Sequence, residues 1–304
     1  MEQIFEAEET RTLDAADCTR LSLMNTNGNV VAEGSDEESI TLRAVKKVKA
    51  SSEAEAQERL NAIRIVVSER KPALDIVTDD SALSPKGKYS VDYTLRIPKR
   101  MVSSLGVANG NVTVSGIAAE TSACAQNGNV RASGIGGRTN AATTNGNVHA
   151  QDVAGPLEAK TVNGNVHALR IEGQAEGRTV NGNIHAEDVA GQAVGHTQNG
   201  NVELSRISGP ASGSATNGNV HATLTKWEPG YKVHFRTRNG NATLVAPEST
   251  SARVSASAPN GRAQCDLPFH ASAQTRTNLE GLIGSGEGQI DLRTTNGNAR
   301  IQRA

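Results

Sequence analysis

Aromatic residues are scarce in this 304-residue sequence, which contains three Phe, three Tyr and one Trp. These are too few for a conventional globular interior, so the core is expected to consist of small aliphatic side chains. An excess of one charge is also lacking, because 31 Lys and Arg balance 32 Asp and Glu. This balance argues against partners such as nucleic acids or anionic membranes, whose binding proteins are typically basic.

Three further absences narrow the class of protein. Cys18, Cys124 and Cys265 are widely separated and show no metal-ligand spacing, so a disulfide framework is not expected. No apolar run approaches the roughly 18 residues of a membrane span. Residues 1–18 have neither the basic nor the apolar region of a signal peptide. The chain as written is therefore expected to be soluble and not exported.

The strongest feature that is present is an internal repeat. The tripeptide Asn-Gly-Asn occurs in seven copies at intervals of 18 residues, without insertion or deletion. Glycine has no Cβ and Asn tolerates left-handed backbone, so the pair suits tight turns. We expect these turns to form a structural ladder of Asn109, Gly110, Asn127, Gly128, Asn145, Gly146, Asn163, Gly164, Asn181, Gly182, Asn199, Gly200, Asn217 and Gly218.

The residues around the turns align in columns that alternate with period two. Val or Ile follows each turn, and Ala, Val or Leu stands two positions later. This alternation predicts half-buried strands, and glycine recurs too often for helices to persist. A run of antiparallel hairpins also fits identical turns. The columns of like residues favour stacked rungs instead, in which Asn side chains hydrogen-bond from rung to rung.

The sequence therefore predicts an all-β fold, namely a parallel β-solenoid of the β-helix or β-roll type with 18-residue coils of two short strands each. Residues 1–104 are expected to form N-terminal strands and a small α+β cap. Its one helix is expected at residues 51–63, with Ser51 or Ser52 as the N-cap. Such a cap would cover one exposed end of the repeat. Residues 105–302 are expected to form the solenoid, continuous with the cap.

Three segments carry a family resemblance: VDYTLRIPKR at residues 91–100, LGVANGNVTVSGI at 105–117 and GEGQIDLRTTNGNARIQ at 286–302. With the regular repeats between them, they resemble the bacterial putative-adhesin family of β-strand-repeat domains of unknown function. The resemblance covers residues 20–302. It implies a β-solenoid with a link to the cell envelope or to surface adhesion, and it brings no catalytic residues.

An outward column between the two inward ones contains four of the seven histidines, with His149, His167 and His185 on successive repeats. Three imidazoles on one rigid face are candidate ligands for Zn²⁺, Ni²⁺ or Cu²⁺. The alternative is a solvated face, because stacked rings do not bring their nitrogens to one point. Asp152 and Asp188 are the only other carboxylates expected nearby. Protonation of the column below about pH 6 is expected to weaken the fold.

Other chemistry has less support in the sequence. Repeated calcium sites are not expected, because the turns carry Asn in place of the required Asp. Glu158 and Glu176 occupy neighbouring repeats, but Lys160 and Arg178 accompany them, which indicates a surface charge ladder more than paired catalytic acids.

The longer interval between Asn217 and Asn239 contains the insertion KWEPGYKVHF. Its aromatic residues Trp227, Tyr231 and Phe235 are candidates for an interaction loop, with padding of the solenoid as the alternative.

The function predicted from these features is a non-catalytic repeat scaffold, an adhesin-like interaction protein of bacterial cell-envelope type. Its expected partner is another protein or a cell-surface macromolecule, with no nucleic acid, no membrane span and no cofactor. The alternative is a metal- or pH-responsive binding module that uses the histidine column. An enzyme acting on polysaccharide is a third and weaker interpretation, since no repeat column offers paired acids.

Overall fold

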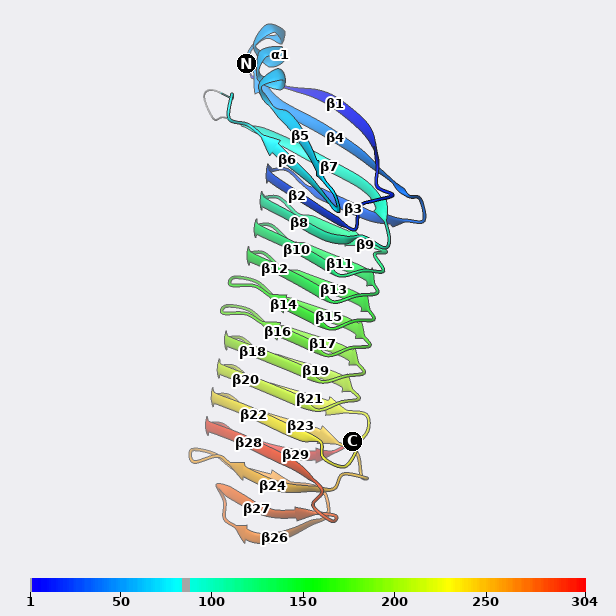
Figure 1. The fold of residues 1–304 in the computed structure, drawn as a ribbon. Helices are drawn as coiled ribbons and strands as arrows, with labels where there is room; N and C mark the ends of the chain where they lie inside the picture. The colour runs from blue at the N-terminus through cyan, green and yellow to red at the C-terminus, as the bar shows by residue number, and fades with distance from the viewer. Residues whose placement is uncertain (1, 84–87) are drawn as a thin grey trace. The chain divides into compact units, whose positions relative to one another are not determined.

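The structure is a computed structural model that describes residues 2–83 and 88–304. The chain divides into two units, residues 1–146 (unit 1) and 147–304 (unit 2), and each is built from two facing layers of strands (Figure 1). In each unit, one strand leads into an Asn-Gly-Asn turn and another follows it. We call the layers that contain these strands the pre-turn sheet and the post-turn sheet.

Unit 1 combines the N-terminal segments with the first repeats. Its elements are β1 (Gln3–Asp14), β2 (Arg20–Asn27), β3 (Val30–Ser35), β4 (Ser39–Ala50), α1 (Glu53–Ala62), β5 (Arg64–Arg70), β6 (Ala73–Asp79), β7 (Tyr89–Pro98), β8 (Val102–Asn109), β9 (Val112–Ser115), β10 (Thr121–Asn127), β11 (Val130–Ile135) and β12 (Thr139–Asn145). The post-turn sheet has the order β1-β4-β7-β3-β9-β11, and the pre-turn sheet has the order β5-β6-β2-β8-β10-β12. The pairs β1–β4, β4–β7 and β5–β6 are antiparallel. The remaining neighbours in these two orders are parallel.

Unit 2 contains the later repeats and the C-terminal strands. Its elements are β13 (Val148–Val153), β14 (Leu157–Lys160), β15 (Val166–Ile171), β16 (Ala175–Arg178), β17 (Ile184–Val189), β18 (Ala193–Asn199), β19 (Val202–Ile207), β20 (Ala211–Asn217), β21 (Val220–Leu224), β22 (Lys232–Asn239), β23 (Ala242–Ala246), β24 (Ala252–Ser257), β25 (Ala263–Cys265), β26 (Phe269–Gln274), β27 (Asn278–Ile283), β28 (Gly288–Asn296) and β29 (Ala299–Arg303). The post-turn order is β13-β15-β17-β19-β21-β23-β29-β25, and the pre-turn order is β14-β16-β18-β20-β22-β28-β24-β27-β26. Antiparallel pairing occurs at β24–β27 and β26–β27.

These pairings confirm the prediction of an all-β protein with parallel sheets. Partners in the repeat strands are 18 residues apart, as in the register of Val166 with Ile184. The proposed boundary at residues 104 and 105 stays a prediction. In unit 1, β8 begins at Val102 and pairs in parallel with both β2 and β10, so the N-terminal strands and the first repeats share a sheet.

Helix α1 is the one helix in the described parts of the chain, and it confirms the helix predicted at residues 51–63. Its N-cap is Ser52, whose hydroxyl accepts a hydrogen bond from the Glu55 N–H at 3.3 Å. The helix buries Ala56 and Leu60 and contacts β4 and β1. Its capping role stays a prediction. The helices that the structure describes include none long and apolar enough to cross a membrane.

The core of unit 2 is thin, which accounts for the shortage of aromatic residues. Its post-turn strands bury two columns completely or nearly so: Val148, Val166, Ile184, Val202 and Val220, and Ala150, Ala168, Ala186, Leu204 and Ala222. The facing pre-turn strands contribute small residues. A Cβ at Gly177 would lie 2.9 Å from Ile184 Cγ2, so the opposite sheet already fills that space.

Side-chain hydrogen bonds connect the turns of successive rungs. Asn181 Nδ2 donates to Asn163 Oδ1 at 2.9 Å, and Asn199 Nδ2 donates to Asn181 Oδ1 at 2.8 Å. Behind the turn, the buried Thr179 hydroxyl donates to the Gly164 carbonyl at 2.9 Å. The side chain of Thr179 therefore supplies a hydrogen-bond donor to a carbonyl group of the turn.

Candidate functional site

The histidine column lies on the outer face of the post-turn sheet of unit 2. It consists of His149 on β13, His167 on β15, His185 on β17, Glu203 on β19 and His221 on β21, which pair in register from strand to strand. Strand alternation directs these side chains outward because their neighbours in each strand point into the core. The rings of His149 and His167 have centroids 4.9 Å apart, and those of His167 and His185 are 5.0 Å apart.

His167 lies between His149 and His185 in the column. Its Nδ1 lies 3.0 Å from the Nδ1 of His149, so one of the two nitrogens donates a proton and the other accepts it. Burial, and then the electrostatic influence of His149 and His185, lower the pKa of His167, while Glu187 opposes this shift. His167 is therefore neutral at neutral pH and has one unprotonated ring nitrogen.

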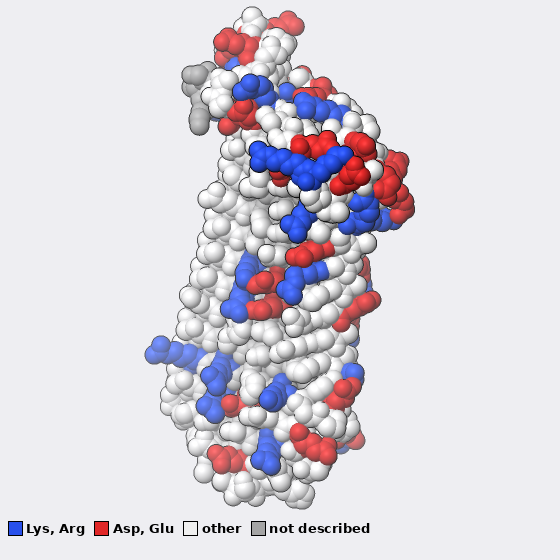
Figure 2. All heavy atoms as spheres, in the orientation of Figure 1, with Lys and Arg blue, Asp and Glu red and all other residues white. Residues whose placement is uncertain are grey.

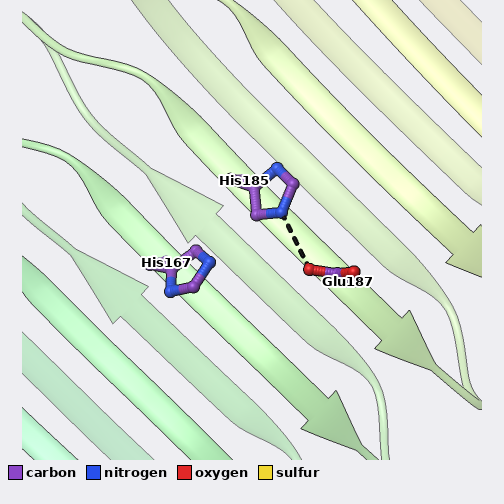
Figure 3. A group of neighbouring side chains, drawn as sticks. All are labelled: His167, His185 and Glu187. Atoms are coloured by element: carbon purple, nitrogen blue, oxygen red, sulfur yellow. Dashed lines mark hydrogen bonds and ion pairs between the residues drawn. The ribbon is translucent and has the colours of Figure 1, made fainter.

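Two carboxylates flank His185. Glu187 Oε2 lies 3.2 Å from His185 Nε2 (Figure 3). On the other side of the ring, Glu203 Oε2 lies 3.3 Å from His185 Nδ1. His167, His185 and Glu187 offer one ligand atom each, and these atoms all lie within 4.8 Å of one another. We call these three residues the histidine site. All three are partly exposed.

The site corrects two expectations from the sequence. Side chains from neighbouring rungs do converge, and the carboxylate beside the histidines is Glu187. Asp152 and Asp188 instead bond to arginines one rung away, Arg170 and Arg206, with Nη2–Oδ2 distances of 2.9 and 2.7 Å. Their backbones explain this outcome: Asp152 and Asp188 have φ values of 54° and 55°, which take their side chains out of the strand alternation.

Arg206 also orients the site. Its Nη2 donates to Glu187 Oε1, which leaves Oε2 on the side of His185. Hydrogen bonding to His185, followed by the bond from Arg206, holds the pKa of Glu187 below its usual value. Glu187 is thus an ionised carboxylate with one oxygen fixed by Arg206.

A sequence signal for Glu187 exists, although the repeat columns obscured it. Residues i and i+2 share one face of a strand, so Glu187 stands beside His185. The equivalent positions on β13, β15 and β19 are Gln151, Leu169 and Ser205, and none of these is acidic. Among these four strands, only β17 has an acidic residue at this position. A comparison of what the repeats share therefore does not reveal it.

The aromatic insertion does not form an exposed loop of three side chains. Phe235 lies in β22 and is fully buried, which corrects its assignment to an interaction loop. Trp227 is only 9% exposed, and its Nε1 donates to the Ser251 carbonyl at 2.9 Å. The Tyr231 hydroxyl donates to the Ser208 carbonyl at 2.8 Å. Burial and these hydrogen bonds to backbone carbonyls hold the aromatic rings against unit 2. This arrangement agrees with the alternative that the aromatic residues pad the solenoid.

The acidic residues of neighbouring pre-turn strands are paired with bases. Glu158 on β14 and Glu176 on β16 lie in register, and each forms an ion pair with the base two residues later, Lys160 or Arg178. These carboxylates therefore belong to a surface charge ladder.

A second surface feature lies on the outer face of the pre-turn sheet of unit 1. One register position across this sheet is apolar on every strand, and we call it the apolar row: Val66, Val77, Met24, Gly106, Cys124 and Ala142. Val66, Val77 and Met24 are 40%, 43% and 54% exposed. The adjacent outward position is polar, with Ser22, Ser104, Ser122 and Asn140.

The apolar row borders a shallow hollow of about 500 Å³, whose lining includes Met24, Val77, Gly106 and Cys124. Strands β8, β10 and β12 contain no Lys, Arg, Asp or Glu, and Figure 2 shows a largely uncharged surface over them. The sequence repeats did not reveal this row, because it depends on the pairing of β5, β6 and β2 with the first repeat strand.

The stacked strands and their outward columns define a repeat protein of the all-β class. The family model of Toastrack DUF4097 matches residues 18–302, and the chain therefore belongs to this family. Membership confirms the resemblance to putative adhesins of unknown function. The comparison with curated proteins finds no match.

Several solved structures resemble the chain, among them the three that follow. A putative cell adhesion protein from Clostridium sporogenes is 9% identical with a TM-score of 0.26, and the match covers 99% of this chain and 100% of that one. A putative adhesin from Bacteroides fragilis is 14% identical with a TM-score of 0.39, covering 98% and 97%. A putative lipid binding protein from Parabacteroides distasonis is 13% identical with a TM-score of 0.39, covering 93% and 96%. Similarity at this level does not bear on what the chain binds.

Proposed function

We propose that the chain is a non-catalytic repeat scaffold, adhesin-like and of bacterial cell-envelope type, that binds another protein through the apolar row of unit 1. The observation that carries this proposal is the exposure of Val66, Val77 and Met24 in one line on a sheet face. Exposed apolar residues that are contiguous and bordered by polar ones are typical of interaction surfaces.

A protein is the partner whose chemistry suits this face. An apolar centre with a polar border matches the anatomy of protein interfaces. Nucleic acid would require an excess of basic side chains. Strands β8, β10 and β12 have none, and Arg64 of β5 is paired with Asp79 of β6. Sugars are usually bound by stacking on exposed aromatic rings, which the apolar row lacks. The hollow beside Met24 would receive side chains of the partner.

Three further observations support the scaffold. Glu158 and Glu176 are engaged in ion pairs, which favours a structural role for them over a catalytic one. The resemblance of residues 91–100, 105–117 and 286–302 to putative adhesins supports the envelope assignment. The stacked Asn side chains support rigidity of the faces, because each rung is bonded to the next.

The test compares capture of host proteins by the full-length chain and by Met24→Lys. We expect the wild type to retain a discrete protein from the solubilised envelope fraction that binds again after purification. Met24→Lys should reduce its retention at least tenfold, because a charge would have to be buried in the interface.

The matched control is Val31→Lys, which places the same charge on the post-turn sheet of unit 1, where Val31 is 39% exposed. Both variants should keep the wild-type melting temperature. Equal retention by wild type and Met24→Lys would overturn the apolar row as the binding face. A partner recovered only from the cytosolic fraction would overturn the envelope assignment.

A second candidate function is a metal- or pH-responsive binding module. The observation that favours it is the convergence of His167, His185 and Glu187 within 4.8 Å. In such a module a bound cation would change retention of the partner. The same capture assay, run with and without Zn²⁺, tests this function, and equal retention would contradict it.

A further inference from the structure

We propose that His167, His185 and Glu187 form a binding site for one divalent transition-metal ion, with Zn²⁺ as the ion whose ligand preferences fit best. This proposal names the ligand of the second candidate function, the metal-responsive module. The biological use of the site rests on that function, but binding of the ion does not. Two imidazole nitrogens and one carboxylate oxygen are a ligand set that Zn²⁺ accepts, with further positions left to water. The site uses one pair of rungs, β15 and β17, and is not repeated along the column.

The hydrogen bonding of His185 is the first reason. Histidine binds a metal as the neutral imidazole, which has a single N–H and can donate to only one partner. His185 nevertheless has carboxylate oxygens on both sides, Glu187 at 3.2 Å from Nε2 and Glu203 at 3.3 Å from Nδ1. If Nδ1–H donates to Glu203, the lone pair of Nε2 faces an oxygen of Glu187. A cation between Nε2 and Glu187 satisfies both atoms.

The orientation of the other two ligands is the second reason. Arg206 bonds to Oε1 of Glu187, which leaves Oε2 for the ion, and Asp188 holds Arg206 in turn. The contact of His167 with His149 is made through Nδ1. When Nδ1–H of His167 donates to Nδ1 of His149, the other nitrogen, Nε2, carries the lone pair that a metal ion needs. Figure 3 shows one ring nitrogen of His167 on the side of His185 and Glu187. Partners of this kind fix ligand orientation in metal sites.

The distances allow closure by side-chain movement alone. Zn²⁺ bonds of about 2.0 to 2.2 Å in a tetrahedron place ligand atoms about 3.3 to 3.5 Å apart. Nε2 of His185 and Oε2 of Glu187 already lie 3.2 Å apart, and all three ligand atoms lie within 4.8 Å. Rotation of the His167 ring closes the remaining gap, and the paired strands stay in register.

The test is a calorimetric titration of the full-length protein with Zn²⁺ at pH 7.5, after removal of metal with a chelator. We expect one ion per chain with a Kd below about 100 µM. Glu187→Gln keeps the shape of the side chain but removes its charge, and it should weaken binding at least tenfold. His167→Asn and His185→Asn should abolish saturable binding, with the metal-free melting temperatures recording any loss of fold.

The matched control is His221→Asn, because His221 occupies the same column on β21 but has Thr223 at the position of Glu187. This variant should bind Zn²⁺ like the wild type. Absence of saturable binding, or equal affinities for Glu187→Gln and wild type, would overturn the site. Zn²⁺ affinity without an effect on partner retention would leave the site standing and contradict only the responsive module.

Discussion

At the scale of the residue, the glycine of each turn is required both by its backbone conformation and by the close approach of the neighbouring rung. Gly182 has a φ of 154°, and a Cβ at this position would lie 2.6 Å from the Gly164 carbonyl carbon. This backbone region is accessible essentially to glycine alone, and the rung below leaves no space for a methyl group. The repeat spacing is therefore fixed by how closely two backbones approach.

Replacing Gly182 with Ala should reduce the free energy of unfolding by about 3 kcal/mol, through backbone strain and overpacking together. Urea denaturation of the full-length protein measures this loss. Gly230 is the matched control, since its φ is 84° but nothing lies within 4 Å of an added Cβ. Gly230→Ala should cost about 1 kcal/mol from backbone strain alone. Similar losses in the two variants would contradict the steric contribution of the neighbouring rung.

At the scale of the element, burial makes one histidine sensitive to acid. His196 on β18 is partly buried, and its Nδ1 lies 2.7 Å from the Ser214 hydroxyl on β20. Burial, and then the charge of Arg178, lower the pKa of His196, while Glu176 opposes the shift. The folded protein therefore binds a proton at His196 less readily than the unfolded chain does.

The sign of the pH dependence follows from this difference. Below the ordinary histidine pKa of about 6.5, the unfolded chain takes up the proton first, so stability falls as the pH falls. The melting temperature of the wild type should be lower at pH 5 than at pH 7.5. His196→Gln removes this titration and should show a smaller decrease. An equal decrease in both proteins would remove His196 as a source of acid sensitivity.

The elements themselves were predictable because their causes are local. Period-two alternation and regular glycine predicted the repeat strands, and Ser52 with the acidic first turn predicted α1. The histidine site was predictable only in part, since the repeat column identified His167 and His185 but did not include Glu187. The apolar row could not be predicted at all. Met24 and Val77 become neighbours through the pairing of β2 with β6, which no repeat in the sequence specifies.

At the scale of the whole molecule, repetition makes rungs of unit 2 interchangeable. Equivalent residues of consecutive rungs are 18 positions apart, as Val148, Val166 and Ile184 show. Each rung contacts its neighbours, so the stability of such a fold is approximately a sum of rung and interface contributions. Removal of a complete rung should then preserve every inward and outward position of the rungs that remain.

Deletion of residues 166–183 joins Asn165 to Ile184, which has the structural role of Val166. We expect the far-ultraviolet circular dichroism per residue to stay unchanged and unfolding to remain a single cooperative transition. Deletion of residues 166–174 is the matched control, because it places pre-turn residues in the post-turn sheet and shifts the stacked Asn side chains out of register. It should abolish the cooperative transition. If both deletions unfold like the wild type, the 18-residue rung is not the unit of stability; if both lose the transition, particular rungs matter more than their repetition.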